Sequence, residues 1–278
     1  MIYVYLVISA ALIPILNNFF PILRQPNSIW LVPVLFIGFF VVLVILHLLL
    51  LVISILLIRE NSPPERGSRY FRTLVNLTLP MVFKLARVHI HMTGEEKIPE
   101  NGRCLFVSNH LHEFDPAVMI AMLPDAELGF IGKKEIRQLY PPVAKAMDKL
   151  HCLLIDRENN REAAKTIIAA AQLLKNDTVS VGLFPEGYCS KDGELQPMRS
   201  GSFKIAYRSQ VPVVVCTLVN SEKIVKNMFR RRTDVYFDIL ECVPYEWFAD
   251  QPTNALGDRV YAEMKENIAR RRAEQEKK

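Results

Sequence analysis

The first 58 residues of this chain contain one charged side chain, Arg24, and no aspartate or glutamate. Within them, Trp30–Ile58 is a run of 29 uncharged residues whose notable polar interruptions are His47 and Ser54. As a helix, this run would reach about 43 Å, which exceeds the roughly 30 Å hydrocarbon core of a bilayer. We therefore expect this segment to span a membrane, either tilted or projecting.

The stretch before it, Met1–Leu16, is apolar but shorter than the usual spanning length of about 20 residues. We predict a hairpin of two membrane helices over residues 1–58 that turns at Asn17–Ser28, with a re-entrant or interfacial first helix as the alternative. A cleaved secretory signal is disfavoured because no Lys or Arg precedes the apolar run and no small-x-small cleavage site follows it.

Basic residues after the long apolar run predict its orientation. Arg59, Arg66, Arg69 and Arg72 follow it, against Arg24 alone in the turn, which places the rest of the chain on the cytoplasmic face of the cell membrane. The five cysteines agree, because their spacing matches no disulfide framework or zinc motif. We expect free thiols in a reducing compartment and no metal site.

Residues 59–87 join the hairpin to the rest of the chain. The charged segment that contains Pro63-Pro64 is predicted to be a linker. Tyr70–Arg87 then mixes apolar and basic residues, which fits either an interfacial amphipathic helix against the lipid head groups or a core helix of the following domain. Pro80 is expected to kink or break this helix.

Residues 88–278 are predicted to form one domain in which short apolar runs alternate with helical stretches. This alternation indicates the α/β class, a mixed central sheet flanked by helices. The basic end, Arg270–Lys278, is expected to be a solvated tail. The expected strands are 103–108, 128–132, 150–155, 179–184, 211–219 and 235–243, and the expected helices are 116–123, 135–148, 160–175, 202–209 and 254–271.

Four residues separate His110 from Asp115, between the apolar run 104–107 and the helical stretch that begins at 116. An imidazole and a carboxylate so placed can meet across one turn, where the carboxylate fixes the ring tautomer and leaves the other nitrogen free to take a proton. Alone, such a pair is more often a structural hydrogen bond than a catalyst. A histidine of near-neutral pKa would nevertheless suit the removal of a proton from a hydroxyl.

Further blocks follow in order. They are Phe130–Glu135, Leu154–Arg157, Phe184–Gly187 and Val211–Val214. Together with Asn109-His110 and Asp115, this order and spacing resemble the glycerolipid acyltransferase family over roughly residues 88 to 245. The resemblance implies direct transfer of an acyl group from a thioester to the hydroxyl of 1-acylglycerol 3-phosphate, with His110 as the general base and Asp115 as its orienting partner.

The resemblance also implies an acceptor-binding loop at Glu186 and Gly187, where glycine permits close approach of a ligand to the backbone. The chain departs from the family at Cys189, which stands where a basic residue usually helps to hold the phosphate. Lys133, Arg157 and Arg199 align with family blocks and could supply the missing charge, although any one of them could be a solvated surface charge. His112 is a second departure and is expected at the rim of the site.

The net positive charge and the family resemblance both indicate which binding partners to expect. Residues 59–278 hold 33 Lys or Arg against 29 Asp or Glu, a balance that favours membrane lipids and an anionic co-substrate, acyl-CoA or acyl carrier protein (acyl-ACP). No nucleic-acid-reading motif accompanies the charge, and no cofactor is expected. Three hypotheses remain: acylation of 1-acylglycerol 3-phosphate, acylation of glycerol 3-phosphate or another lysolipid, and a non-enzymatic membrane protein that binds lipid or acyl-ACP.

Overall fold

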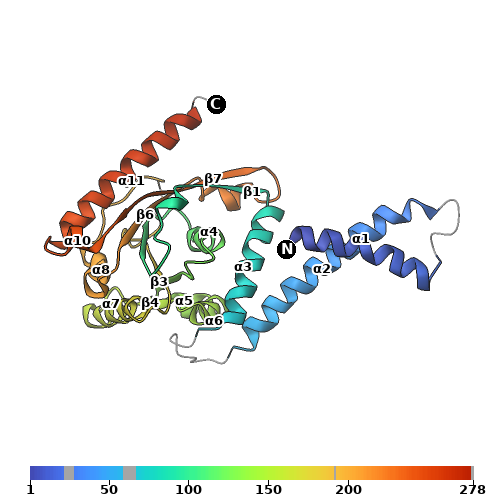
Figure 1. Ribbon diagram of the computed structural model, residues 1–278, viewed down its shortest axis with the longest axis horizontal. Coiled ribbons are helices and arrows are strands. Elements are labelled where there is room, and N and C mark those ends of the chain that lie inside the picture. Colours follow the sequence, from blue (N-terminus) through green and yellow to red (C-terminus); the bar gives the residue numbers. More distant parts are fainter. Residues whose placement is uncertain (22–27, 59–66, 191, 277–278) are drawn as a thin grey trace.

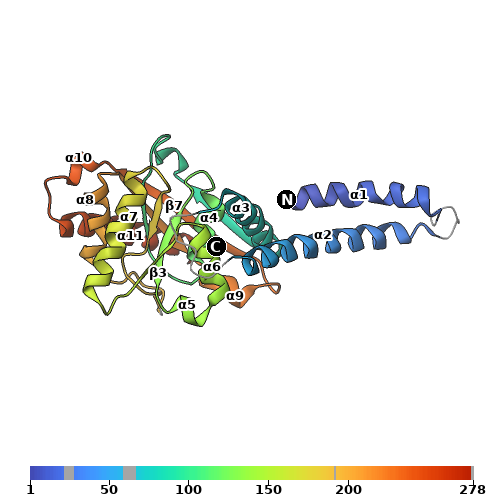
Figure 2. The same cartoon turned by 90° about the horizontal axis from the view of Figure 1, so that it is seen from below.

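A computed structural model describes residues 1–21, 28–58, 67–190 and 192–276 as a helical hairpin that projects from an α/β body (Figures 1 and 2). Helices α1 (Ile2–Phe19) and α2 (Leu31–Leu56) form the hairpin. Both are long and apolar enough to cross a membrane, and only 17% of α1 and 11% of the most apolar stretch of α2 are buried inside the protein. Such exposure of apolar helices supports association with a membrane. Residues 22–27 of the predicted turn, with Arg24, and the flanking Arg59 and Arg66 lie outside the described residues.

The two polar interruptions of the long apolar run are both hydrogen-bonded. His47 lies between the Tyr5 hydroxyl, 2.6 Å from its Nδ1, and the Thr78 hydroxyl, 2.8 Å from its Nε2. Ser54 bonds the hydroxyl of Tyr70 at 3.0 Å. Because an unpartnered polar group in an apolar environment is costly, these contacts explain how α2 tolerates them. They also fasten the hairpin to helix α3 (Arg69–Leu85).

Helix α3 is a core helix of the body, the second of the two alternatives considered for this segment. Phe71 and Val75 pack into the core of the body, while Thr78 faces the hairpin. The helix is continuous across Pro80, so proline does not break it. Arg72 is buried and donates to the carbonyl oxygens of Leu128 and Leu150, so its charge lies inside the body.

The body is built on one mixed sheet of seven strands in the order β1-β7-β6-β2-β5-β3-β4. Neighbouring strands are parallel except β6 and β7, which are antiparallel. The bounds are β1 (Val88–Thr93), β2 (Leu105–Ser108), β3 (Gly129–Lys133), β4 (Leu153–Ile155), β5 (Val181–Leu183), β6 (Val213–Val219) and β7 (Thr233–Val243).

Helices cover both faces, which confirms the predicted fold class. Central strand β2 is buried throughout, with Phe106 facing α3 and α4 while Leu105 and Val107 face α7, α8 and α11. This burial on both faces accounts for its continuous apolar run. The remaining helices are α4 (Asp115–Met122), α5 (Ile136–Leu139), α6 (Pro141–Lys149), α7 (Asn160–Lys175), α8 (Lys204–Ser209), α9 (Lys223–Asn227), α10 (Tyr245–Phe248) and α11 (Thr253–Glu276), with short 3₁₀ turns η3 (Glu95–Lys97) and η4 (Ser200–Phe203).

One local prediction was wrong, and one strand was not predicted. The expected helix 135–148 is two helices, α5 and α6, because Tyr140 precedes Pro141-Pro142 and a residue before proline disfavours the helical conformation. Strand β1 was missed and pairs with β7 along its whole length.

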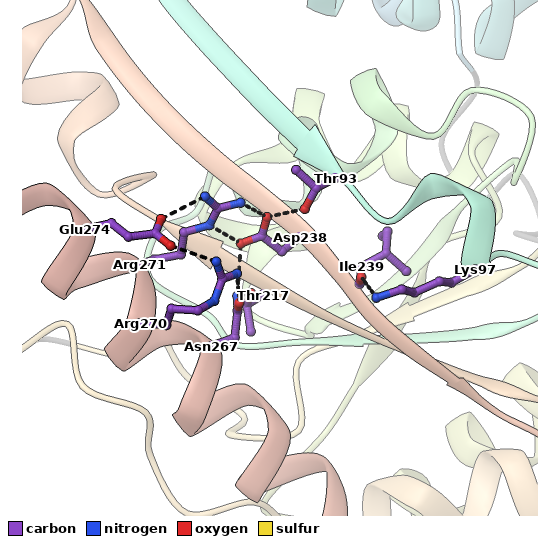
Figure 3. Close-up of polar contacts among 9 residues, drawn as sticks. All are labelled: Thr93, Lys97, Thr217, Asp238, Ile239, Asn267, Arg270, Arg271 and Glu274. Carbon is purple, nitrogen blue, oxygen red and sulfur yellow. Dashed lines mark hydrogen bonds and ion pairs between the residues drawn. The ribbon is translucent and has the colours of Figure 1, made fainter.

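The expected C-terminal tail is also wrong as far as Glu276, because α11 continues to that residue. Arg271 donates to both carboxylate oxygens of Asp238 on β7, at 2.5 and 2.7 Å (Figure 3). Asn267 on the same helix bonds Asp238 at 2.9 Å and Thr217 at 2.6 Å. Burial alone would raise the pKa of Asp238, but its bonds with Arg271, Thr93 and Asn267 outweigh burial and lower it. The end of the chain is thus part of the fold.

Candidate active site

The sequence blocks meet at one edge of the sheet. Strands β2, β5, β3 and β4 are neighbours and parallel, so their carboxyl ends lie together. His110 follows β2, Glu186 follows β5, Lys133 ends β3 and Arg157 follows β4. Ligand sites of α/β sheets commonly form at such an edge.

The loop after β2 is anchored by its first residue. Asn109 is buried, and its side-chain amide both donates to the carbonyl of Leu218 at 2.9 Å and accepts from the Leu218 N–H at 2.7 Å. The amide therefore continues the pairing of β2 with β6 beyond the last strand residue. This role of Asn109 was not predicted, although its place directly before His110 was the available signal.

His110 and Asp115 form the predicted contact. Nδ1 of His110 lies 2.9 Å from Oδ2 of Asp115, at the start of α4. The same oxygen accepts from the backbone N–H groups of Leu111 at 2.6 Å and His112 at 2.9 Å. Asp115 is fully buried, so this carboxylate is held rigidly and fixes the orientation of the ring.

The second ring nitrogen of His110 has a neighbour that was not predicted. Nε2 lies 3.2 Å from Sγ of Cys189, so the expectation of a free nitrogen was wrong. The ring also stacks on Phe184, with centroids 4.2 Å apart. Burial of the ring disfavours its cation, but Asp115 and Cys189 outweigh this and raise the pKa of His110 to about 9. The expected near-neutral pKa of His110 is therefore not found.

Glu186 is buried and uses both carboxylate oxygens on backbone groups. Oε1 accepts from the N–H of His110 at 2.6 Å, and Oε2 accepts from the N–H of Gln196 at 2.8 Å. Burial raises the pKa of Glu186, partly countered by these two hydrogen bonds. In this arrangement Glu186 joins the histidine loop to the loop after β5. Its predicted contact with substrate stays a prediction.

Gly187 and Arg199 lie against each other. Gly187 has φ +85°, and a Cβ there would come 3.0 Å from Nε of Arg199. A side chain at this position would be strained and would push against the guanidinium, which accounts for glycine. Arg199 is otherwise exposed, and its backbone N–H bonds the carbonyl of Pro185 at 3.0 Å.

Arg157 is near the same loop. Burial first, and then the positive charge of Arg199, lower the pKa of Arg157, while Glu135 and Cys189 act in the opposite direction. Within the described part of the chain, no ion pair to a carboxylate engages either guanidinium. Two nearby arginines without a carboxylate partner beside a histidine make a region suited to an anion.

Lys133 and His112 lie farther out. Lys133 is exposed at the end of β3, and its neighbour Lys134 pairs with Asp156 at 2.8 Å. His112 is half-buried, stacks on Phe114 with centroids 5.5 Å apart, and accepts from the Phe114 N–H at 3.3 Å. No group of three or more His, Cys, Asp or Glu that could hold a metal ion occurs in the segments that the structure describes. All five cysteines are free thiols.

Comparison with known proteins agrees with this geometry. The family model described as Acyltransferase matches residues 89–219. A probable 1-acyl-sn-glycerol-3-phosphate acyltransferase of Mycoplasma pneumoniae is 31% identical over 59% of this chain and 60% of its own length. The human 1-acyl-sn-glycerol-3-phosphate acyltransferase alpha is 28% identical over 69% of this chain and 68% of its own length.

A solved structure shares the fold. The crystal structure of the 1-acyl-sn-glycerophosphate acyltransferase from Thermotoga maritima superposes with a TM-score of 0.61, covering 81% of this chain and 88% of that one at 22% identity. The first relative is matched over only about three fifths of its length. The residues matched by the family model, 89–219, include the strands and loops that carry the histidine and glutamate blocks.

Proposed function

We propose, from the match of residues 89–219 to the acyltransferase family model, that this protein transfers an acyl group from a thioester to the free hydroxyl of 1-acylglycerol 3-phosphate. The product would be phosphatidic acid, a precursor of phospholipids. The observation that carries the proposal is the contact between buried Asp115 and half-buried His110 at the sheet edge, in the segment that matches the family model.

His110 would act as the general base. Removing the proton from the acceptor hydroxyl requires the neutral ring, and Asp115 would stabilise the imidazolium that forms. A bound acceptor hydroxyl would displace the thiol of Cys189 from Nε2 in a direct transfer. A thioester carbonyl close by would then be attacked by the oxygen, and the donor would leave as a thiol.

Arg157 and Arg199 would hold the phosphate of the acceptor. Arg199 lies against Gly187, and its charge lowers the pKa of Arg157, which supports a shared anionic ligand. Lys133, exposed at the neighbouring strand end, would contribute charge at the rim. Gly187 would let the ligand approach the backbone, and Glu186 would keep the two loops in register.

The donor would be acyl-CoA or acyl-ACP, and the hairpin would hold the site at the cytoplasmic face of the membrane. An exposed basic segment with Phe229, Arg230, Arg231 and Arg232, between α9 and β7, would attract either anionic donors or anionic lipids. Residues 1–58 would be the anchor and residues 88–278 the catalytic part, and helix α3 of the junction 59–87 packs into the core of that part.

Cys189 favours a second candidate within the same class. A thiol cannot form the paired hydrogen bonds by which arginine grips a phosphate. The acceptor would then be glycerol 3-phosphate or a lysolipid with another head group. A lipid-binding or acyl-ACP-binding protein without catalysis is the third possibility, and the preserved His110–Asp115 contact argues against it.

The test is acyl transfer by the purified full chain in detergent micelles. Labelled acyl-CoA and acyl-ACP would be offered with 1-acylglycerol 3-phosphate, glycerol 3-phosphate and monoacylglycerol. We expect phosphatidic acid as the main product and a loss of about 10²–10⁴-fold in His110→Ala. His112→Ala, which keeps the backbone N–H bonded to Asp115, is the matched control and should stay close to wild type. Failure of every acceptor would overturn the proposal.

A further inference from the structure

Two apolar projections stand on the surface of the α/β body. The first projection, residues 139–143, joins α5 to α6, and all five of its residues are exposed. Leu139 is 68% exposed, and Tyr140 and Val143 are each 51% exposed. The second projection, residues 228–231, follows α9 and carries Phe229, which is 70% exposed. Large apolar side chains that gather on a surface in this way mark a site of interaction with a protein or a membrane.

The topology of the sheet places the candidate active site between the two projections. Strands β6, β2, β5 and β3 are neighbours and parallel, so their carboxyl ends share one edge. Helix α5 follows β3 and α9 follows β6, whereas His110 and Glu186 follow the two strands in between, β2 and β5. Figure 2 shows α5 and α9 along the lower side of the body. The projections therefore flank the loops that carry His110 and Glu186.

Both projections lie in basic segments. Residues 133–149 hold five Lys or Arg against two Asp or Glu, and residues 222–231 hold four against one. Arg230 and Arg231 are exposed beside Phe229. A Lys or Arg close to an anionic lipid surface contributes about 1 kcal/mol of attraction. Apolar tips with basic flanks thus complement a bilayer that contains anionic head groups.

The first projection is continuous with the membrane hairpin. Helix α6 packs against α2, and Met147 of α6 belongs to the same core cluster as Ile58 at the end of the hairpin. Both views show α6 beside the end of α2 (Figures 1 and 2). Helix α2 has 26 residues, more than the roughly 20 that span a bilayer, and such excess length is accommodated by tilting. A tilted α2 brings the body down onto the lipid surface.

We propose that the two projections form a second membrane contact, apart from the hairpin, which rests the active-site edge on an anionic bilayer. Leu139, Tyr140 and Val143 enter the head-group region on one side of the edge, and Phe229 enters it on the other. Tyrosine is enriched at this depth in membrane proteins because its ring is apolar and its hydroxyl is polar. The contact requires membrane association but does not depend on the proposed reaction. A lipid acceptor then reaches the site without leaving the bilayer.

Quenching of tryptophan fluorescence by brominated lipids tests the contact directly. The full chain would be placed in vesicles of phosphatidylglycerol and phosphatidylcholine, with or without bromine on the acyl chains. Trp30→Phe and Trp247→Phe remove both native tryptophans, and Tyr140→Trp or Phe229→Trp then introduces a single probe. We expect at least about 2-fold quenching of either probe, because an interfacial side chain lies about 5–10 Å into the boundary of head groups and acyl chains.

The matched control keeps Trp247 as the single tryptophan and changes only Trp30→Phe. Trp247 is exposed on α10, which follows β7. Because β7 is antiparallel to β6, α10 lies at the opposite edge of the sheet from His110. Its fluorescence should therefore not respond to bromine in the same vesicles.

Kinetics would test whether the contact serves the acceptor, a step that rests on the proposed function. Leu139→Ser should raise the KM for 1-acylglycerol 3-phosphate in vesicles by about 5-fold or more, and it should leave the KM for a short-chain, water-soluble analogue unchanged. Ile168→Ser alters an exposed apolar residue on α7 and is the matched control, which should change neither KM.

The outcomes separate this inference from the proposed function. Absence of quenching at either probe, or equal quenching of Trp247, would overturn the second contact and leave the acyltransferase proposal standing. Equal quenching in vesicles of phosphatidylcholine alone would overturn the role of anionic lipids. Unquenched probes together with dimers of the chain in the vesicles would assign the surface to a second copy and also overturn the proposal. Quenching at both probes without acyl transfer to any acceptor would support the contact and refute the proposed reaction.

Discussion

Replacing Glu186 with glutamine would test whether this residue positions the base or contacts the acceptor. The two carboxylate oxygens accept from the N–H groups of His110 and Gln196, at 2.6 and 2.8 Å. Glutamine has nearly the same shape but only one acceptor oxygen. Its amide nitrogen would face one of the two backbone N–H groups. One hydrogen bond would therefore be replaced by an unfavourable contact between two N–H donors.

The size of the effect follows from these two bonds. A hydrogen bond to a charged group contributes about 1.5–3 kcal/mol, and a buried donor without a partner costs about 1–3 kcal/mol. Burial of the charge works the other way, since it raises the pKa of Glu186 and glutamine carries no such penalty. We expect the free energy of unfolding to fall by about 3 kcal/mol at most.

Kinetics would separate the two roles. If Glu186 acts through the backbone of His110, Glu186→Gln should lower kcat by about 10-fold or more and change the KM for the acceptor by less than about 2-fold. Thermal unfolding in the same detergent would show the lost stability. The matched control is Glu194→Gln on the same loop, where the carboxylate is largely exposed and pairs with Arg272. That change should cost less than about 1 kcal/mol.

A different pattern would refute this reasoning. If Glu186→Gln raised the acceptor KM strongly while kcat and thermal stability stayed at wild-type values, the carboxylate would be reaching the substrate. The hydrogen bonds to His110 and Gln196 would then not hold in the working enzyme.

Four further predictions follow from the structure. Asp115→Asn should lower acyl transfer by about 100-fold or more in a folded protein, because the imidazolium loses its buried carboxylate; a wild-type rate would contradict this. Arg199→Gln and Arg157→Gln should raise the KM for a phosphate-bearing acceptor more than the KM for the donor, and an unchanged acceptor KM would speak against a phosphate site. Because the pKa of Asp238 is lowered in the fold, its contribution is present above its ordinary value of 3.8 and is lost as pH falls through the lowered pKa; the stability advantage of wild type over Asp238→Asn in urea unfolding should therefore shrink below about pH 4, and a constant difference would refute it. A reporter fused after Lys278 should be cytoplasmic, and its protection from protease added to the cytoplasmic face of inverted vesicles would contradict the predicted orientation.

The class of fold and the grouping of the blocks could be predicted because both depend on local pattern. Apolar runs such as Val213–Val219 are strands buried on both faces, and residues that follow parallel strands must meet at one edge. Strand β1 carried a usable signal in the alternation of Val88, Ile90 and Met92 with polar residues, although the segment was not among the expected strands. The break at Tyr140 was likewise signalled by Pro141-Pro142.

The unpredicted features depend on partners far away in the sequence. Arg271 looked like a solvated tail residue because its partner, Asp238, lies 33 positions earlier on a strand across the sheet. Cys189 looked like a lost phosphate ligand because its contact with His110 spans 79 positions and two loops. Residue type and spacing within a block do not determine such contacts, since they arise only from how the loops at the sheet edge pack.

The loop after β5 therefore controls the histidine from three sides. Glu186 accepts from the backbone N–H of His110, the Ser190 N–H donates to its carbonyl at 2.7 Å, and Cys189 lies against its ring. Farther along, Arg272 of α11 donates to Gly193 and Glu194, which fastens the same loop to the end of the chain. A ligand that moves this loop must also move His110. A ligand that fits the loop without moving it leaves His110 in its present orientation. If the acceptor binds to this loop as proposed, its binding would be coupled to the position of His110 through one short segment, and the residue at position 189 would affect both.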